Sequence, residues 1–246
     1  MKKLLAVFAH PDDEAFGPGG TLAKYAKEGV EIHLLCATRG ERGQWEENSK
    51  FKIQNSKINQ KLEIHNVREK ELLRSADILG VKRVDFLDFI DGHLCNANYH
   101  VLTKKIIAKI KSFKPQVVMT LDRLGVSGHL DHIAVSMITT YSYLKTRDAY
   151  KLYYFCLSKQ QRRLEGDDYF VYFPEGYSED QITTRINYSE FFKIKSSAMY
   201  QHQSQLVDVK AILSYLIKIP KIDNFILQYH RKVSVKFPET DLFTGI

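Results

Sequence analysis

The chain has 246 residues, of which 44% are hydrophobic and 26% are charged, and its formal net charge is +7. This composition is that of an ordinary globular protein, and it excludes disordered, collagen-like and disulfide-rich chains. The three cysteines, Cys36, Cys95 and Cys156, form no Cys-x-x-Cys pair, so neither a disulfide framework nor a thiolate zinc site is indicated.

The apolar stretch at the N-terminus predicts a buried first strand. It is shorter than the apolar region of a secretory signal peptide, and it ends in His-Pro-Asp-Asp instead of a small-residue cleavage site. No run approaches the ~18 apolar residues of a membrane helix. We therefore expect a cytoplasmic protein without a membrane span.

Apolar runs and helical periodicities alternate along the first 157 residues. The runs that predict strands lie at residues 3–9, 30–38, 84–89, 116–121 and 151–157. The spacings that predict helices lie at residues 21–28, 54–79, 103–113 and 131–144. This alternation predicts an α/β fold: a Rossmann-like, doubly wound, mostly parallel sheet with helices on both faces.

The pattern weakens beyond residue 158. Residues 169–173 resemble a strand, and residues 190–201 and 205–218 resemble helices. No stretch has the composition of a linker between domains. We therefore expect a single domain over residues 1–246 whose C-terminal part, about residues 158–246, is elaborated.

Two polar motifs follow predicted strands. The sequence HPDDE at residues 10–14 comes directly after the first strand, and HLDH at residues 129–132 follows the fourth strand after a short loop. Ligands of open α/β sheets bind beyond the carboxyl ends of the strands, so both motifs are expected at one site. Together they supply His, Asp and His for a divalent metal, with spare carboxylates and a spare imidazole.

Metal-assisted hydrolysis needs such a set: ligands, a base for the attacking water and a donor for the developing oxyanion. Either motif alone is also compatible with an acidic loop or a helix cap. Their occurrence after two apolar strands favours the metal site. Two histidines and an aspartate suit Zn²⁺, and Fe²⁺ equally well.

A glycine-rich turn at residues 17–20 invites comparison with nucleotide-binding loops. It matches neither G-x-G-x-x-G nor G-x-x-x-x-G-K-[ST]. We therefore predict a tight turn with a close backbone approach before a helix. A nucleotide-binding domain is the less favoured alternative.

Segments spread over the first 145 residues together form a specific signature. They read AHPDDEAFGPGGTLAKY at 9–25, TRGERG at 38–43, REKEL at 68–72, ADILGV at 76–81, LDFIDG at 87–92, KPQVVMT at 114–120 and GHLDH at 128–132. A weaker match runs from Lys195 through His202 to Gln205. On these segments the chain resembles the PIG-L/LmbE-like family of zinc-dependent deacetylases, which includes GlcNAc-phosphatidylinositol, GlcNAc-inositol and GlcNAc-malate de-N-acetylases.

The resemblance implies roles for the matching residues. The implied metal ligands are His10, Asp13 and His132. Asp12 would be the general base. His129 would stabilise the oxyanion, and Asp131 would orient His129. The implied cofactor is Zn²⁺, with Fe²⁺ as the alternative.

The resemblance further places Arg68 and Asp91 at positions that contact sugar hydroxyls in relatives, and Glu14 outside the ligand set. Leu130 replaces the usual proline of this motif, and Ser127 stands where some relatives carry a tyrosine that assists the oxyanion. The stretch 44–66 is longer than expected, and the C-terminal third matches little. Both regions are therefore candidates for substrate choice.

Together these observations predict a hydrolase that removes the acetyl group from an N-acetylglucosamine-type glycoside or related N-acetyl amine, giving the amine and acetate. The alternatives are an amide hydrolase acting on a non-sugar acyl amine and a binding protein that keeps the metal without turnover. The intact Asp12 and His129 argue against the second alternative.

Lysine and arginine outnumber acidic residues in residues 51–120, which predicts either solvated helix faces or a preference for an anionic aglycone. Their helical spacing, without interleaved aromatics, argues against nucleic acid as a partner. The expected partner is a small N-acetyl amino sugar. The sequence leaves the oligomeric state open and is compatible with a homo-oligomer.

Overall fold

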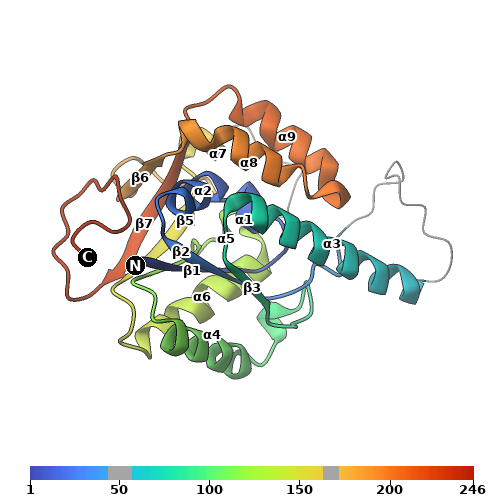
Figure 1. Cartoon of the computed structure of the whole chain (residues 1–246). Coiled ribbons are helices and arrows are strands. Elements are labelled where there is room, and N and C mark those ends of the chain that lie inside the picture. Colours follow the sequence, from blue (N-terminus) through green and yellow to red (C-terminus); the bar gives the residue numbers. More distant parts are fainter. Residues whose placement is uncertain (44–56, 163–171) are drawn as a thin grey trace.

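The computed structural model describes residues 1–43, 57–162 and 172–246. These residues form a seven-stranded sheet in the order β3-β2-β1-β4-β5-β7-β6 (Figure 1). The strands are β1 (Lys3–Phe8), β2 (Glu31–Cys36), β3 (Arg83–Phe86), β4 (Val117–Leu121), β5 (Lys151–Cys156), β6 (Thr184–Asn187) and β7 (Ile222–His230). Strands β1 to β5 pair in parallel, whereas β7 runs antiparallel to both of its neighbours.

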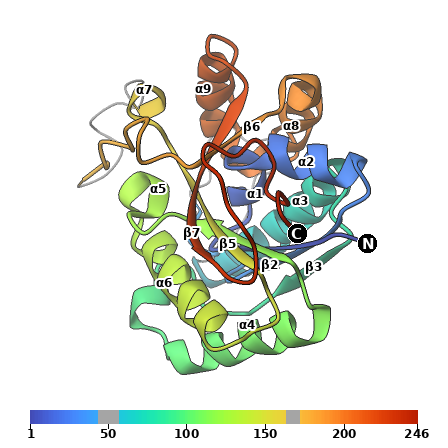
Figure 2. The same ribbon diagram turned by 90° about the vertical axis from the view of Figure 1, so that its left-hand side faces the viewer.

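Helices cover both faces of this sheet (Figures 1 and 2). On one face α2 (Gly19–Lys27), α3 (Lys57–Leu79) and α8 (Phe192–Met199) pack against one another, with α9 (Leu206–Leu216) beyond them. On the other face α4 (Tyr99–Phe113) packs against α6 (Leu130–Leu144). The short helices are α1 (Asp13–Phe16), α5 (Gly125–Gly128) and α7 (Lys159–Arg162). The predicted α/β fold is therefore confirmed.

The central strands are buried because helices cover them on both sides. Every residue of β4 and of β5 is buried, and so is β1 after its first residue. Such strands lose the polar–apolar alternation of a half-exposed sheet and appear as continuous apolar runs. This is why the sequence predicts them well.

The order of the strands positions the two polar motifs. From β1 the chain adds β2 and then β3 on one side, and later returns to add β4 and β5 on the other side of β1. The order therefore reverses between β1 and β4, and a crevice forms at the carboxyl ends of strands at such a point. The HPDDE motif follows β1, and the HLDH motif follows β4 through α5.

Several boundaries differ from the predictions, and two strands were not predicted. Helix α4 begins four residues before the expected position because the side chain of Asn98 accepts a hydrogen bond from the backbone N–H of His100 and caps the helix. Neither β6 nor β7 was expected. Within the predicted strand 169–173, residues 169–171 lie outside the described residues, and Tyr172 and Phe173 are not in a strand.

The predicted close approach in the glycine-rich turn is confirmed at Gly20. A Cβ atom on Gly20 would lie 2.2 Å from the ring of Tyr188, a distance that no real side chain tolerates. The glycine therefore lets α2 pack directly on this tyrosine, which is buried. No helix among the described residues is long and apolar enough to cross a membrane.

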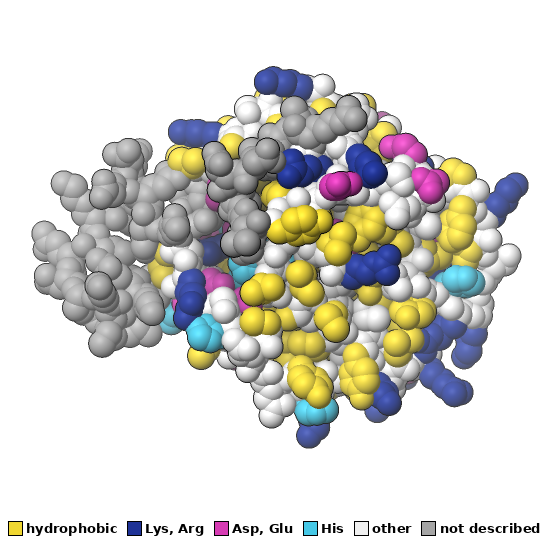
Figure 3. All heavy atoms as spheres, turned by 180° about the vertical axis from the view of Figure 1, so that it is seen from behind, with side chains coloured by type: hydrophobic (Ala, Val, Ile, Leu, Met, Phe, Trp, Pro, Cys, Tyr) yellow, Lys and Arg dark blue, Asp and Glu magenta, His cyan; other side chains and the backbone are white. Residues whose placement is uncertain are grey.

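The outer side of α6 carries exposed apolar residues. They are Leu130, Met137, Tyr141 and Leu144. Figure 3 shows hydrophobic side chains spread across this side of the molecule. The opposite side of α6 is buried in the core through Val135 and Ile138, so the helix carries apolar residues on both its buried and its exposed side.

Candidate metal centre and active site

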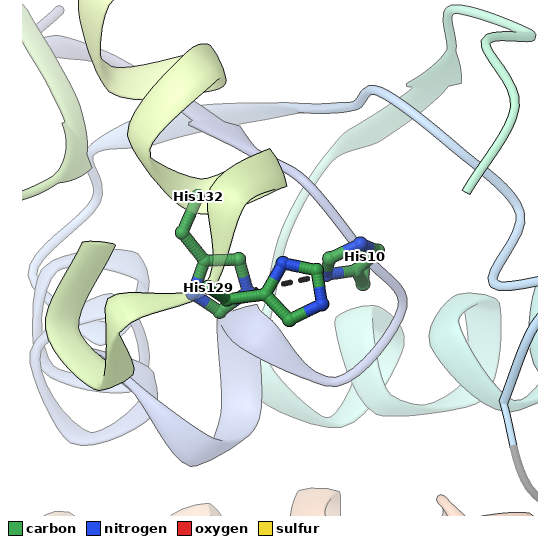
Figure 4. A group of neighbouring side chains, drawn as sticks. All are labelled: His10, His129 and His132. Atoms are coloured by element: carbon green, nitrogen blue, oxygen red, sulfur yellow. Dashed lines mark hydrogen bonds between the residues drawn. The ribbon is translucent and has the colours of Figure 1, made fainter. Parts of the chain in front are cut away.

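The two polar motifs meet at the switch point of the sheet, although more than a hundred residues separate them. Nδ1 of His10 lies 3.1 Å from Nε2 of His132, and the same Nε2 lies 3.2 Å from Oδ1 of Asp13. The ligand atoms of His10, His129 and His132 all lie within 4.8 Å of one another. Figure 4 shows the three imidazoles grouped between the loop after β1 and the start of α6.

The outer hydrogen bonds of His10 and His132 indicate where their protons lie. Nδ1 of His132 faces the carbonyl oxygen of Gly125 at 3.0 Å, so it donates and leaves a lone pair on Nε2. Nε2 of His10 faces the carboxylates of Asp91 and Asp131, so it donates and leaves a lone pair on Nδ1. Two nitrogen lone pairs that face each other at 3.1 Å repel each other, so this arrangement requires a cation or a proton between the two nitrogens.

The spacing of these atoms also fits a cation. Ligand atoms that each lie about 2.1 Å from one zinc ion are separated by roughly 3.4 Å in tetrahedral geometry. The separations of 3.1 and 3.2 Å around Nε2 of His132 are close to this value. The donor set of two imidazoles and one carboxylate therefore fits a divalent metal.

Asp13 is fixed by the backbone of its own loop. Its Oδ2 accepts hydrogen bonds from the N–H groups of Ala9 and His10 at 3.0 and 2.9 Å, which leaves Oδ1 directed at His132. Burial opposes ionisation of Asp13, but His132 and His10 hold its pKa well below its usual range. Asp13 is therefore an ionised and preoriented carboxylate, as a metal ligand requires.

Asp91 and Asp131 both lie against Nε2 of His10, at 3.0 and 3.2 Å. Burial lowers the pKa of His10, but these two carboxylates and Asp13 outweigh it and raise that pKa to about 10. Without a metal, a proton on Nδ1 of His10 therefore lies between the two rings at pH 7, in the place that a bound cation would take. Together the three side chains form a second close group of potential ligand atoms. Its carboxylates are occupied, however, by backbone N–H groups of Arg42, Gly92 and Leu94. We interpret Asp91 and Asp131 as groups that orient His10.

Asp131 and Asp91 both contact His10, which the roles predicted for them did not include. The backbone N–H of Asp131 donates a hydrogen bond to Nδ1 of His129 at 3.1 Å. The carboxylate of Asp131 instead accepts a hydrogen bond from Nε2 of His10. Asp91 was expected at the sugar. Its carboxylate lines the cavity but also binds His10 and the backbone of Arg42.

Asp12 occupies a strained position beside the ligands. Its φ is 118°, which a residue with a side chain rarely adopts. Oε2 of Glu14 accepts a hydrogen bond from the Asp12 N–H at 3.0 Å, and the Arg68 guanidinium donates to the Asp12 carboxylate at 2.7 Å. Burial raises the pKa of Asp12 to about 6 despite the opposing charge of Arg68. A carboxylate with such a pKa is suited to accept a proton near neutral pH.

The guanidinium of Arg68 forms hydrogen bonds with other groups of the protein. It is 4% exposed, and its donors reach the carbonyl oxygens of Pro11 and Gly40 as well as Asp12. Arg68 thus helps to hold the loop after β1, and because it also lines the cavity its contact with a sugar stays a prediction.

His129 is the N-cap residue of α6, and its Nδ1 accepts the N–H of Asp131. Burial, followed by the nearby His10 and His132, lowers the pKa of His129 to about 4. The imidazole is therefore neutral at pH 7, with its proton on Nε2. A neutral N–H of this kind can donate to an oxygen that becomes negative.

A buried network behind Asp12 was not predicted as part of the site. Oε1 of Glu14 accepts from Ser75 at 2.5 Å and lies 2.7 Å from Nε2 of His202. Glu14 and His202 are fully buried. The sequence placed Glu14 outside the ligand set, whereas His202 belonged only to the weaker C-terminal match, which was the available signal.

A cavity of about 700 Å³ opens onto these residues. It is lined at the metal centre by His10, Asp12, Asp13, His129 and His132. Arg42, Arg68 and Asp91 also line it, as do apolar residues from the ends of β4 and β5 and from α9. Asp122, Cys156 and most of the strand residues are buried elsewhere and do not reach it.

Comparison with known proteins places the chain in a family. A model of the PIG-L family, described as GlcNAc-PI de-N-acetylase, matches residues 5–142. A mycothiol S-conjugate amidase of Streptomyces coelicolor is 30% identical over 99% of this chain and 97% of its own length. A 1D-myo-inositol 2-acetamido-2-deoxy-alpha-D-glucopyranoside deacetylase of Rhodococcus jostii is 35% identical over 56% of this chain and 52% of its own.

Two solved structures share the fold. The N,N'-diacetylchitobiose deacetylase of Pyrococcus horikoshii aligns with a TM-score of 0.68 and 21% identity, covering 92% of this chain and 84% of its own. GalB, the 4-carboxy-2-hydroxymuconate hydratase of Pseudomonas putida KT2440, aligns with a TM-score of 0.71 and 17% identity, covering 96% of this chain and all of its own. Because one fold supports both reactions, it does not identify the reaction. The sequence matches do identify the family: this chain belongs to the PIG-L family.

Proposed function

We propose that the chain is a metal-dependent N-deacetylase that acts on an N-acetylglucosamine-type glycoside or a related N-acetyl amine. Water adds to the amide carbonyl, the C–N bond breaks, and the products are acetate and the free amine. The nitrogen takes up a proton as it leaves. The observation that carries this proposal is the convergence of two imidazole nitrogens and one carboxylate oxygen beside a second carboxylate of raised pKa.

His10, Asp13 and His132 would hold the metal, and Asp91 and Asp131 would fix the orientation of His10. A bound divalent cation supplies Lewis acidity, which lowers the pKa of water and polarises an amide carbonyl. The ligand set suits Zn²⁺ and also Fe²⁺. A carboxylate that orients a ligating histidine typically changes metal affinity by roughly 10–100-fold.

Asp12 would transfer protons, and His129 would stabilise the negative charge of the reacting amide. Asp12 accepts a proton from the attacking water and can return it to the departing amine. His129 donates its Nε2–H to the carbonyl oxygen as negative charge develops there. With a pKa of about 6, Asp12 is mostly ionised at pH 7 and can act as a base. With a pKa of about 4, His129 is neutral at this pH.

The relatives support the same class of reaction. The proteins of Rhodococcus jostii and Streptomyces coelicolor are named a deacetylase and an amidase, and both names describe amide cleavage. The similarity to the amidase spans nearly the whole chain, which keeps a second candidate open. In that alternative the scissile amide carries an acyl group other than acetyl.

The test combines metal analysis with acetate release. Purified protein is loaded with Zn²⁺ or Fe²⁺ and assayed on free N-acetylglucosamine, a neutral N-acetylglucosamine glycoside and an anionic glycoside at two salt concentrations. We expect one metal per chain and acetate release from at least one N-acetyl sugar. A similar rate on the neutral and anionic glycosides would show that the basic stretch 51–120 is a solvated surface.

The same assay contains the results that would contradict the proposal. Metal-loaded protein that cleaves no N-acetyl sugar but releases other acyl groups from non-sugar amines would favour the amide hydrolase. Metal bound at one per chain without cleavage of any amide would favour the binding protein.

A further inference from the structure

The cavity at the metal centre has a polar half and an apolar half, and the strand order separates them. Its lining on the β2 and β3 side includes Arg42, Arg68 and Asp91. Its lining on the β4 and β5 side includes Leu121 and Phe155, which lie at the carboxyl ends of those strands. Strand β1 lies between the two sides, and the metal centre follows β1. A substrate bound at the centre therefore meets hydrogen-bonding groups on one side and apolar side chains on the other.

Helix α9 extends the apolar half. Its lining residues change from Gln205 and Asp208 at the N-terminal end to Ile212 and Leu216 toward the C-terminal end. Ile212 and Leu216 lie about 6 Å apart along the helix axis. The apolar wall of the cavity thus continues well beyond the reach of a single methyl group.

One polar side chain on this side, Gln161, is internally satisfied, and the other polar residues here, Gln205, Asp208 and Tyr215, lie on or at the start of α9. Gln161 also lines the cavity. Its Oε1 accepts from the Ser158 N–H and from the Asn224 amide, and its own amide donates to the carbonyl oxygen of Ile222. Gln161 therefore adds little polarity beside Leu121 and Phe155, where burial of apolar substrate atoms is the main interaction that the cavity offers.

We propose that the apolar half binds the acyl group of the substrate, and that the chain cleaves N-acyl amino sugars whose acyl group is an apolar chain of several carbons. The inference rests on the proposed amide hydrolysis and extends it to a longer acyl group. Water adds to the carbonyl carbon, the C–N bond breaks, and a fatty carboxylate and the free amino sugar leave. The proton ends on the sugar nitrogen.

The position of the metal centre assigns the two substituents of the amide to the two halves. The carbonyl carbon must lie at the centre, so its carbon chain and its nitrogen extend in different directions. A polyhydroxylated amine requires hydrogen-bond partners, which the exposed guanidinium of Arg42 on the β2 and β3 side can supply. The acyl chain then extends toward Leu121, Phe155 and α9. An acetyl group would fill only the beginning of this half.

The first experiment compares N-acetyl-, N-butanoyl-, N-hexanoyl- and N-octanoylglucosamine with metal-loaded protein, measuring the free amine released. Each buried methylene contributes about 0.8 kcal/mol, which corresponds to roughly a fourfold rise in kcat/KM. We expect kcat/KM to rise with chain length until the apolar half is full. Equal or falling values from acetyl onward would overturn the inference while leaving deacetylation intact.

A matched pair of variants tests the position of the chain. Ala211 is an exposed residue of α9 that lines the cavity, so Ala211→Phe places a ring in the apolar half without overpacking the core. Ser214→Phe adds the same side chain at an exposed position of α9 outside the lining. The ratio of kcat/KM for the hexanoyl over the acetyl substrate should fall about tenfold in Ala211→Phe and stay within twofold in Ser214→Phe. Equal ratios in both variants would overturn the assignment.

Two further arms separate the other outcomes. Octyl and methyl glycosides of N-acetylglucosamine are compared in the same assay, and a preference for the octyl glycoside without a preference for long acyl chains would move the aglycone into the apolar half. Calorimetry with metal-free protein measures binding of N-octanoylglucosamine against N-acetylglucosamine without any turnover. Tighter binding of the octanoyl compound, weakened by Ala211→Phe, supports the placement of the acyl chain in the apolar half, and a lack of cleavage in the first experiment would then count against the proposed hydrolysis alone. Equal binding overturns the placement.

Discussion

The region up to β5 and the region after it contribute different things to the same cavity. The first region carries the candidate ligands and the candidate base, all at the carboxyl ends of parallel strands, and the family model matches only within it. The second region contributes α9 and much of the apolar wall, and it completes the sheet with antiparallel strands. The candidate ligands and base thus lie in the first region alone, whereas both regions line the substrate cavity.

This division explains why one part of the sequence is recognisable and the other is not. A metal centre requires particular residue types at fixed distances, so it leaves a motif. An apolar wall requires only side chains of suitable size, and many sequences satisfy that condition. Changes in the first region should therefore affect metal binding and turnover, and changes in the second should affect the choice of substrate.

The largest effect is expected for His132→Ala. The imidazole supplies one of three ligand atoms, so its loss should reduce the bound metal and lower activity to background. Metal content and amide cleavage are measured on the same preparation. Leu130→Ala, an exposed change within the same motif, is the control and should retain both. Full metal content in His132→Ala would show that this residue is not a ligand.

The second-largest effect is expected for Asp12→Asn. The amide has the shape of the carboxylate but cannot accept a proton, so kcat should fall at least ~100-fold while the metal is kept. Metal analysis and steady-state kinetics distinguish this result from loss of the site. If turnover stays near that of the unchanged protein, the base lies elsewhere, and Glu14 becomes the residue to test.

Asp91→Asn should weaken metal binding without abolishing it. The carboxylate lies 3.0 Å from Nε2 of His10 and is one of two that orient this ring. Loss of such a partner typically costs about 10–100-fold in metal affinity. Competition with a chelating dye measures the change, and Asp88→Asn, at an exposed residue nearby, is the control. Unchanged affinity together with a raised KM would return Asp91 to the role of a sugar contact.

Arg68→Lys should have a smaller effect, and mainly on kcat. Lysine keeps the charge but loses the planar fork that reaches Asp12 and the carbonyl oxygens of Pro11 and Gly40. A fall of about tenfold in kcat with little change in KM is expected, since one charged hydrogen bond contributes ~1.5–3 kcal/mol. The reverse pattern, a raised KM at constant kcat, would mean that Arg68 binds substrate directly.

His202→Gln tests whether the second region also supports the chemistry. Its ring lies 2.7 Å from Oε1 of Glu14, which in turn holds the backbone of Asp12. We expect a loss of ~1–3 kcal/mol in the free energy of unfolding and a decrease of a few fold in kcat. Thermal unfolding and kinetics are compared with His230→Gln, at an exposed position. If kcat is unchanged while stability falls, His202 only supports the fold.

The sequence allowed much of the first region to be predicted, because its buried strands are continuous apolar runs and its motifs follow them. The chain order also placed His10 and His132 near each other. Strand β7 escaped prediction because Asp223 and Asn224 interrupt it. Both are buried and satisfied by distant partners, Thr21 for Asp223 and Gln161 for Asn224. Partners so far away in the sequence leave no local signal.

The orientation of the side chains at the site could not be predicted either. A motif places Asp131 next to His132, but only the three-dimensional arrangement directs its carboxylate to His10. The same holds for Arg68, which the sequence assigned to the substrate and the structure pairs with Asp12. The apolar wall gave no signal, because Leu121 and Phe155 resemble core residues when read from the sequence.

The position of β7 between β5 and β6 has a consequence for the order of folding. Strand β5 is buried along its whole length, and in the described part of the chain its outer edge pairs with residues 222–230, for example Phe155 with Phe225. During synthesis the chain therefore contains every candidate ligand well before the edge of β5 can be covered. An unpaired apolar edge favours aggregation, so the last strand protects the nascent protein as well as completing its sheet.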